Sequence, residues 1–440
     1  MAVSSADVLF ALRRRQLVSA RDLAHDLRTS QPTLSRALSL LRDEYVVLGK
    51  ARATRYAAVD PSSAFRTGVP LFRVNAAGRV RPFGTLTPLL GGKTLHVRGT
   101  TQSLHASLPW FIEDLRPQGF LGRLLARSLS RDLGASADPR LWTTDQVLRA
   151  LAYRADDVPG DLLVGTDARD RFVRASLQPS MVERDGYEGI VGRQLAGEPP
   201  GSSAGGEQPK FACRASPSRH VLVKYSPPLD ASRAARRWAD LLRCEELALA
   251  VLRSSGIAAA RAEYVEYGGR AYLEVERFDR TPEGRRGVVT GTMVDAEWVG
   301  SGAWIALAEG LAAKSQLVKA DAARVRLLHT FGGLIGNTDM HLGNVAFFTD
   351  DYARFRLAPS YDMLPMALRP TAHGELPTVD PELPLPAPGH LATWRRAAAL
   401  ADETLAQMST HRGLDEAVRD FALRTRAKVA ALRKVAHRIA

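Results

Sequence analysis

The first sixty residues carry three stretches with apolar side chains at helical spacing, followed by two short strand-like runs. Apolar positions over residues 6–12 predict one helix, Ser19 can cap a second, and Ser30 can cap a third with proline in its first turn. Tyr45–Leu48 and residues 55–59, separated by a polar turn, then predict a β-hairpin. The predicted order is three helices and a hairpin.

That order resembles a winged helix-turn-helix domain, in which the third helix enters the major groove of DNA. The start of this helix would meet base edges, and basic residues of the hairpin would meet phosphates. The residues predicted to contact DNA are Gln31, Thr33, Ser35, Arg36, Lys50, Arg52 and Arg55. The alternative is a small helical module for dimerisation whose polar face is only solvated.

The next region changes to short apolar runs broken by turns. Asp60–Ser63 is predicted to be a linker. Residues 69–98 predict several strands, with turns at Ala77-Gly78 and Gly91-Gly92. Leu108–Arg127 opens a helical region. This region predicts a β-rich module followed by helices, and its residues suggest no chemistry.

Between residues 197 and 278 a Gly/Ser-rich run precedes two strands, a helix and a hairpin. Such a run is commonly a linker. Here it leads directly into a strand at Lys210, and a second strand carries Lys224. Kinases use this order in their N-lobe, where loop N–H groups and a strand lysine hold phosphates. Glu245, in the middle of the helix, could hold that lysine. The alternatives are an edge-strand lysine and a solvated glutamate.

Three polar residues in the last third of the chain have a spacing that suits phosphoryl transfer. Asp339 and Asn344 are spaced like the base and the metal-binding Asn of the HRDxxxxN loop of protein kinases. A predicted hairpin would fold Asp362 back toward Asn344. A carboxylate can accept the proton of a hydroxyl, and oxygen ligands suit Mg²⁺. The alternatives are ordinary turn residues, or a metal hydrolase using His341, for which no second histidine at ligand spacing is found.

Charge and cysteine content narrow the class of protein. Sixty Lys and Arg against 47 Asp and Glu give a net charge of +13, which favours polyanion partners such as nucleic acid. Two cysteines imply no disulfide framework. No apolar run approaches the roughly 18 residues of a membrane span, and the N-terminus has no signal-peptide pattern. The expected location is cytoplasmic, with no membrane partner.

Five segments together resemble the HipA-like serine/threonine kinases, which are toxins of bacterial type II toxin–antitoxin systems. The resemblance covers about residues 69–437 and is strongest in the last two segments. The segments are LPWFIEDLRPQG (108–119), SAGGEQPK (203–210), VERFDR (275–280), IGNTDMHLGN (335–344) and LAPSYDML (357–364). Family toxins usually lack a DNA-binding domain, so the fused N-terminal domain suggests the YjjJ-like branch.

The resemblance implies roles for residues that match the family's motifs. Asp339 would be the catalytic base, and Asn344 and Asp362 would hold Mg²⁺. Ser203 would be autophosphorylated, which would push its loop away from ATP and silence the enzyme. His341 more simply shapes the loop than acts as an acid. The positions implied to lie at ATP are Ser203, Ala204, Gly205, Gly206, Lys224, Glu276, Phe278 and His341.

The resemblance further implies an α+β fold, with a winged helix-turn-helix followed by a HipA-like bilobal protein-kinase-like fold. The N-lobe would be β-rich and the C-lobe mainly helical. The expected domains are 1–60 for the winged helix-turn-helix, 61–195 for the HipA-like N-terminal subdomain, 196–280 for the kinase N-lobe with its Gly-rich loop, and 281–440 for the C-lobe.

The predicted function is an ATP- and Mg²⁺-dependent serine/threonine protein kinase that inhibits growth and binds its own operator DNA. Family substrates include aminoacyl-tRNA synthetases, so a synthetase or another translation component is the expected substrate by analogy. The fused DNA-binding domain leaves open whether a separate antitoxin exists, and a homodimer would suit a palindromic operator.

Two other functions fit parts of the pattern. One is a transcription regulator whose kinase-like fold only senses a nucleotide or ligand. The other is a small-molecule kinase of the aminoglycoside phosphotransferase type, against which the serine in the Gly-rich loop counts.

Overall fold

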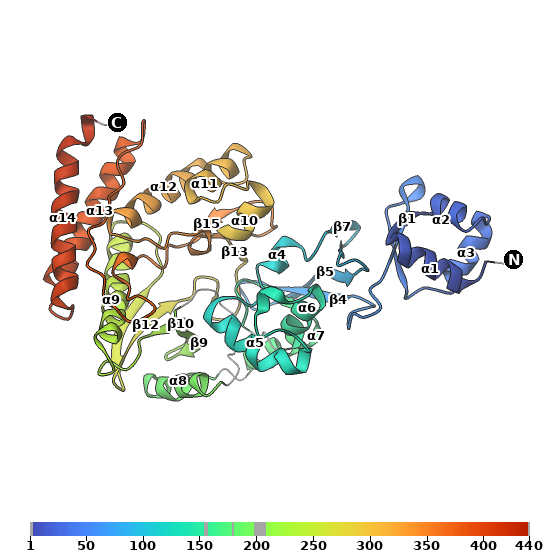
Figure 1. Ribbon diagram of the computed structural model, residues 1–440, viewed down its shortest axis with the longest axis horizontal. Helices are drawn as coiled ribbons and strands as arrows, with labels where there is room; N and C mark the ends of the chain where they lie inside the picture. Colours follow the sequence, from blue (N-terminus) through green and yellow to red (C-terminus); the bar gives the residue numbers. More distant parts are fainter. Residues whose placement is uncertain (1–2, 154–156, 178–179, 198–207, 439–440) are drawn as a thin grey trace.

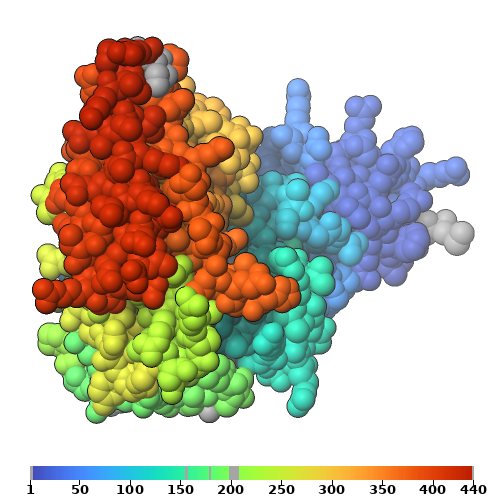
Figure 2. Space-filling model, turned by 60° about the vertical axis from the view of Figure 1, so that its left-hand side comes forward, coloured from blue at the N-terminus to red at the C-terminus, as the bar shows by residue number. Residues whose placement is uncertain are grey.

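The computed structural model describes residues 3–153, 157–177, 180–197 and 208–438 (Figure 1). Groups of helices and strands follow one another along the molecule in chain order. The N-terminal module lies at one end and the two C-terminal helices lie at the other (Figure 1). Figure 2 shows the N-terminal module protruding from the side of the larger body.

The N-terminal module packs three short helices against a small antiparallel sheet. Its elements are α1 (Ser5–Arg15), β1 (Leu17–Ser19), α2 (Ala20–Asp26), α3 (Gln31–Ser39), β2 (Tyr45–Leu48) and β3 (Arg55–Ala58). The hydroxyl oxygens of Ser4, Ser19 and Ser30 each accept a backbone N–H from the first turn of a helix. The predicted hairpin of β2 and β3 is present, and β1 extends it to the order β1-β3-β2.

A five-stranded antiparallel sheet with four helices forms the next module. Its elements are β4 (Val69–Val74), β5 (Val80–Pro88), β6 (Thr94–Arg98), β7 (Thr101–His105), α4 (Trp110–Glu113), α5 (Gly119–Leu133), α6 (Thr144–Tyr153), β8 (Leu162–Val164) and α7 (Thr166–Leu177). The strand order β7-β6-β5-β4-β8 brings the last strand back beside the first. The predicted succession of strands and then helices is therefore present, with β8 as an addition.

The segment Asp60–Ser63, predicted to be a linker, is a hydrogen-bonded turn. The hydroxyl of Ser63 is buried and donates to Oδ1 of Asp145 at 2.6 Å. Gln102 on β7 also reaches the N-terminal hairpin, where its Oε1 accepts the N–H of Gly49 at 2.9 Å. These contacts attach the N-terminal module to the five-stranded sheet.

A four-stranded antiparallel sheet with a long helix follows. Its elements are α8 (Tyr187–Leu195), β9 (Lys210–Ala215), β10 (Arg219–Tyr225), α9 (Arg233–Ser254), β11 (Ala262–Tyr267) and β12 (Arg270–Glu276). The order β11-β12-β10-β9 places β10 inside the sheet. Lys224 therefore lies on an interior strand, and the edge-strand alternative is wrong.

The C-terminal part is mainly helical, with one small sheet. Its elements are β13 (Val288–Thr290), α10 (Gly291–Trp298), α11 (Trp304–Ala313), α12 (Lys319–Leu334), β14 (Ala346–Phe348), β15 (Arg356–Leu357), α13 (Leu391–Thr410) and α14 (Glu416–Val435). The predicted hairpin before Asp362 is formed by β14 and β15, and β13 pairs with β14. In the parts of the chain that the structure describes, no helix is long and apolar enough to cross a membrane.

Candidate active site

A cavity of about 340 Å³ lies between the four-stranded sheet and the β13–β14 segment. Leu222 on β10 and Val275 on β12 give it an apolar wall, and polar side chains converge from the other elements. Lys224 and Asp362, which meet here, are 138 positions apart. The predicted site residues that line the cavity are Lys224, Glu276, Phe278, His341, Asn344 and Asp362.

Lys224 is held between two carboxylates in this cavity. Its Nζ donates to Oε1 and Oε2 of Glu245 at 2.7 and 2.6 Å, and it also donates to Oδ1 of Asp362. The Glu245 side chain is 0% exposed, so the solvated alternative for this residue is wrong. The interior strand β10, the helix α9 and the segment after β15 therefore meet at one ammonium group.

Burial and charge act against each other on these three groups. Burial acts to lower the pKa of Lys224, but the carboxylates of Asp362 and Glu245 outweigh it and raise this pKa above its ordinary value. Burial raises the pKa of Glu245. Burial would also raise the pKa of Asp362, yet the positive charges of Lys224 and Lys210 hold it below its ordinary value. At neutral pH the cavity therefore contains a charged lysine beside a charged Asp362.

Asp362 is fixed by its backbone as well as by its side chain. Its φ of +54° is left-handed, which is rare for a residue other than glycine. The Asn337 side-chain amide donates to the carbonyl oxygen of Asp362 at 3.0 Å, and the Asp362 N–H donates to Glu245 Oε1 at 3.2 Å. Backbone strain of this kind clusters at functional sites, where surrounding contacts hold it in place.

The loop after α12 holds Asp339 and Asn344 in a fixed orientation. The N–H of Asp339 donates to Oδ1 of Asn337 at 3.0 Å, and Nδ2 of Asn344 donates to the carbonyl oxygen of Asp339 at 2.8 Å. Nδ1 of His341 accepts the N–H of Gly343 at 3.0 Å. A neutral ring with this bond carries its proton on Nε2, which lies 4.0 Å from Oδ1 of Asp339. His341 thus shapes the loop, as expected.

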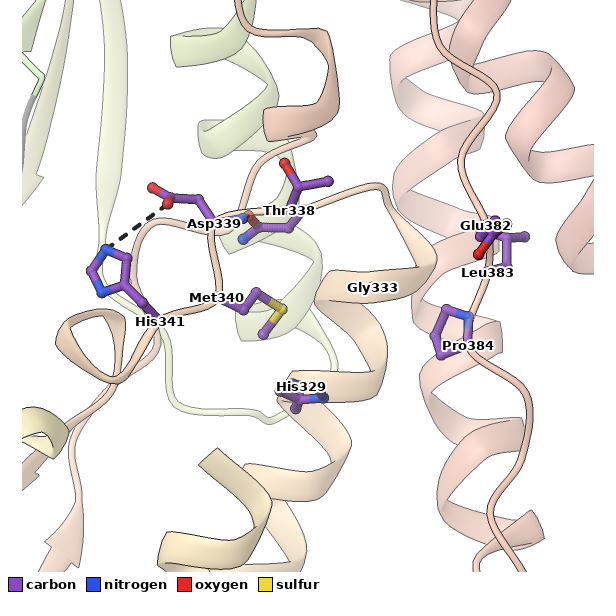
Figure 3. A pocket seen from close by; sticks show the side chains of 10 residues that line it. His329, Gly333, Thr338, Asp339, Met340, His341, Glu382, Leu383 and Pro384 are labelled. Atoms are coloured by element: carbon purple, nitrogen blue, oxygen red, sulfur yellow. Dashed lines mark hydrogen bonds and ion pairs between the residues drawn. The ribbon is translucent and has the colours of Figure 1, made fainter. Parts of the chain in front are cut away.

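Asp339 lines a neighbouring open pocket of about 600 Å³ and not the 340 Å³ cavity (Figure 3). His341 lines both hollows. Figure 3 shows Asp339 and His341 on one side of the open pocket, across from Glu382, Leu383 and Pro384. The Asp339 side chain is 41% exposed. A hydroxyl group of another molecule can therefore reach this carboxylate from outside.

Asn344 and Asp362 fit a magnesium ion by their chemistry. Because Nδ2 of Asn344 is bonded to the Asp339 carbonyl, its amide oxygen is the atom left for a ligand role. Mg²⁺ takes oxygen ligands, and proteins commonly hold it with one or two carboxylates plus substrate phosphates. Among the described residues, no group of three or more His, Cys, Asp or Glu could hold a metal. The protein thus offers a partial set of ligands that phosphate oxygens would complete.

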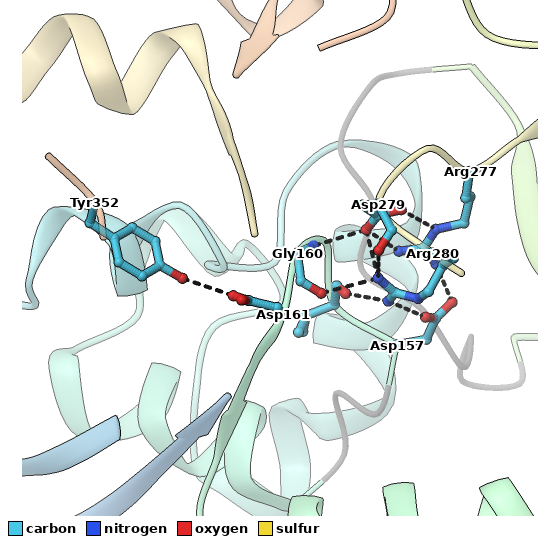
Figure 4. A network of polar contacts seen from close by, with 8 residues as sticks. Asp157, Gly160, Asp161, Arg277, Asp279, Arg280 and Tyr352 are labelled. Atoms are coloured by element: carbon cyan, nitrogen blue, oxygen red, sulfur yellow. Dashed lines mark hydrogen bonds and ion pairs between the residues drawn. The ribbon is translucent and has the colours of Figure 1, made fainter. Parts of the chain in front are cut away.

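The segment that leaves β12 is fixed by a buried ion-pair network (Figure 4). The Asp279 carboxylate accepts from Arg277 at 2.8 Å, from Arg280 at 2.7 Å and from the N–H of Gly160 at 2.9 Å. Nη2 of Arg280 also donates to Asp157 at 2.6 Å. Burial acts to raise the pKa of Asp279, but the two guanidinium groups hold it well below its ordinary value. This network joins the cavity wall to the chain before β8.

Two cavity residues were not singled out by the sequence. Lys210 lies at the start of β9, 3% exposed, at the end of the SAGGEQPK segment that carried the resemblance. Asp114 comes from a segment that suggested no chemistry, and its Oδ2 accepts the N–H of Thr290 at 2.9 Å. Burial raises the pKa of Asp114 to about 6. The role of Asp114 depends on a contact 176 positions away, which no local pattern reports.

The remaining predicted residues fall in two places. Ser203, Ala204, Gly205 and Gly206 lie outside the described residues. The predicted DNA-contacting residues lie at the start of α3 and around the turn between β2 and β3, and all but the half-buried Thr33 are exposed. These exposed residues are Gln31, Ser35, Arg36, Lys50, Arg52 and Arg55.

Comparison with known proteins gives matches over most of the chain. A family model described as the HipA-like C-terminal domain matches residues 202–432, and one described as the YjjJ-like toxin, middle domain, matches residues 65–173. Toxin YjjJ of Escherichia coli (strain K12) is 35% identical over 416 residues, which cover 92% of this chain and 93% of that protein.

A solved structure shares the fold. It is HipA of the Shewanella oneidensis MR-1 toxin–antitoxin system, in complex with HipB and operator DNA. The TM-score is 0.52 at 15% sequence identity, and the match covers 82% of this chain and 96% of that chain. At this identity the similarity is one of fold alone.

Proposed function

The chain belongs to the HipA-like toxins and their YjjJ-like group, and from this premise we propose that it is an ATP- and Mg²⁺-dependent serine/threonine protein kinase that inhibits growth. The observation that carries the proposal is the pairing of Lys224 with Glu245 and Asp362 in a cavity that Asn344 also lines. Phosphoryl transfer needs a cation for the phosphates, an acid to position that cation, and oxygen ligands for the metal.

In this proposal ATP occupies the 340 Å³ cavity. Its base lies against the apolar wall and Phe278, near Glu276, while Lys224 and Lys210 attract its phosphates. Asn344 and Asp362 hold Mg²⁺, which when bound neutralises phosphate charge. Because Lys224 is already positioned by Glu245, little side-chain ordering remains to be done when ATP binds.

Asp339 acts as the base toward a serine or threonine hydroxyl that enters from the open pocket. Its carboxylate accepts the hydroxyl proton while the hydroxyl oxygen bonds to the γ-phosphorus, and the bond from that phosphorus to ADP breaks. The hydrogen bonds from Asp339 to Asn337 and from Asn344 to Asp339 keep this carboxylate at the boundary between the two hollows. His341 supports the same loop.

The proposal extends to the Gly-rich loop on the strength of the family resemblance. The backbone of Ala204, Gly205 and Gly206 would cover the ATP phosphates. Ser203 would receive a phosphate from the enzyme's own site. The added negative charge would favour a loop position away from ATP, and the enzyme would become inactive.

Incubation of the purified protein with Mg²⁺, γ-labelled ATP and a bacterial lysate tests the proposed kinase. We expect label on serine or threonine with the wild type, and a loss of about a hundredfold or more with Asp339→Asn, because the base is removed. Asp167→Asn is the control, since Asp167 is an exposed carboxylate on α7. A wild type that binds ATP but transfers no label would contradict the kinase and favour a nucleotide-sensing regulator.

For the N-terminal module we propose a winged helix-turn-helix that binds operator DNA, with domains at 1–60, 61–195, 196–280 and 281–440. The exposed start of α3 and the basic hairpin turn support this role. Electrophoretic mobility shifts with the DNA upstream of its own gene provide the test. Arg36→Ala should weaken binding about tenfold, while Arg236→Ala, at an exposed site on α9, should leave it unchanged.

The partners of the chain are proposals of the same kind. HipA of Shewanella oneidensis occurs with HipB and operator DNA. In the present chain the fused module would contact DNA directly, as a homodimer where the operator is palindromic. The proposed substrate is a translation component such as an aminoacyl-tRNA synthetase, and phosphopeptide mapping of the labelled lysate would identify it.

A further inference from the structure

A second cavity, of about 1060 Å³, lies between the five-stranded sheet and the β14–β15 hairpin. It shares no lining residue with the proposed ATP cavity. Seven arginines and two aspartates line it. The arginines come from the β4–β5 hairpin, the end of β6, the segment before β13 and β15. None of them has a role in the proposed phosphoryl transfer.

The two aspartates leave most of this positive charge unbalanced. Nε of Arg73 donates to Oδ2 of Asp161 at 2.7 Å, and Asp161 also accepts from Tyr352 at 3.1 Å (Figure 4). Arg356 pairs with Asp350 at 3.3 Å. Within the described residues, four exposed arginines of the cavity make no ion pair. They are Arg79, Arg81, Arg98 and Arg286.

The walls hold these arginines close together. The guanidinium of Arg98 lies 4.5 Å from the ring centre of Phe83, and that of Arg73 lies 5.6 Å from the same ring on another side of the cavity wall. At the bottom, Arg285 is buried, and burial followed by the charge of Arg280 lowers its pKa to about 9. Like charges gathered in a partly enclosed space repel each other, so an anion in the cavity would relieve the repulsion.

The arrangement also indicates the kind of anion. Guanidinium groups bind phosphate oxygens through paired N–H donors, and Arg79, Arg81, Arg98 and Arg286 face the cavity from different segments. A single phosphate would leave most of a 1060 Å³ cavity unfilled. Several phosphates in a row would reach several of these arginines at once. The exposed aromatic edge of Phe348 adds an apolar surface beside them.

We propose that this arginine cavity is a second, non-catalytic binding site for an anion with closely spaced phosphate groups. A free oligophosphate and a nucleic-acid strand both carry this chemistry. The site is adjacent to the proposed kinase centre, because the Phe348 ring in its wall contacts the Phe278 ring in the wall of the ATP cavity at 5.7 Å. The proposal concerns binding alone and does not depend on kinase activity.

The test uses the full chain and two probes without added Mg²⁺. Inorganic tripolyphosphate is measured by isothermal titration calorimetry, and a labelled single-stranded oligonucleotide by fluorescence anisotropy. The test variant is Arg81→Gln with Arg98→Gln, both at exposed sites in the cavity. The matched control is Arg127→Gln with Arg131→Gln, which removes the same charge from exposed positions on α5.

We expect the cavity variant to bind at least one probe about tenfold or more weakly than the wild type, while the control stays within about twofold. A loss for tripolyphosphate alone identifies a free oligophosphate as the ligand class. A loss for the oligonucleotide identifies a nucleic-acid strand. If neither probe binds the wild type, or if both variants bind like the wild type, the proposal is overturned.

Discussion

Lys224 depends on two carboxylates that reach it from distant parts of the chain. We expect Glu245→Gln to lower the free energy of unfolding by about 2–3 kcal/mol, because a buried charge loses one of its two partners. Urea denaturation measures this change. Glu283→Gln, at an exposed site, serves as the control and should stay within about 0.5 kcal/mol of the wild type. Equal losses in the two variants would contradict the role given to Glu245.

Asp114 gives the molecule a pH dependence that can be calculated in sign. Its pKa of about 6 in the folded protein lies above the ordinary 3.8, so the folded state keeps a proton that the unfolded state has lost. The resulting stabilisation is complete below pH 3.8 and disappears as the pH rises through 6. Relative to Asp114→Asn, the wild type should lose about 2–3 kcal/mol of unfolding free energy between pH 4 and pH 7.

Urea denaturation across this pH range checks the prediction for Asp114. The asparagine can keep the hydrogen bonds to Thr290, so the comparison isolates the titration. Parallel stability profiles for the two proteins would show that this carboxyl does not titrate as described.

At the residue scale, the sequence predicted the residues of the site better than their partners. Lys224, Asn344 and Asp362 were predicted to gather, and they line one cavity. The spacing of polar residues along a strand and a loop was enough for that. Asp114 was missed, since its only signal is a contact with Thr290 on a strand far along the chain.

The β2–β3 hairpin is the element that should carry phosphate contacts in the proposed DNA complex. We expect Arg52→Ala to weaken binding to all DNA sequences alike and to reduce the slope of log affinity against log salt by about 1. Fluorescence anisotropy over a series of salt concentrations measures the slope. Arg236→Ala supplies the comparison, and an unchanged slope in Arg52→Ala would remove this hairpin from the interface.

Elements that pair locally were predicted, and elements that pair over long distances were not. The strands β10 and β12 and the helix α9 follow apolar patterns and lie where the sequence placed them. The three-residue strands β8 and β13 are too short to show a period, and their partners are far along the chain. The helix predicted from Ser301 starts instead at Trp304, because N–H groups at 301 and 302 donate to Asp295 at 3.0 and 2.8 Å.

At the scale of the whole molecule, the buried network around Asp279 joins the N-terminal β-module to the four-stranded sheet. We expect Asp279→Asn to lower the free energy of unfolding by about 3 kcal/mol, because Arg277 and Arg280 would stay buried with less countercharge. Differential scanning calorimetry should show a lower Tm. Asp380→Asn breaks only an exposed ion pair and should change little. An unchanged Tm in Asp279→Asn would mean that other contacts hold the two parts together.

The central claim is that this chain is a kinase that silences itself through its Gly-rich loop. The most direct test is the intact mass of the purified protein before and after incubation with Mg-ATP, beside Asp339→Ala and Ser203→Ala. The account predicts that the wild type alone gains one phosphate, at Ser203. No gain in a wild type that still binds ATP would contradict it, and the kinase-like fold would then be a nucleotide sensor attached to a DNA-binding module.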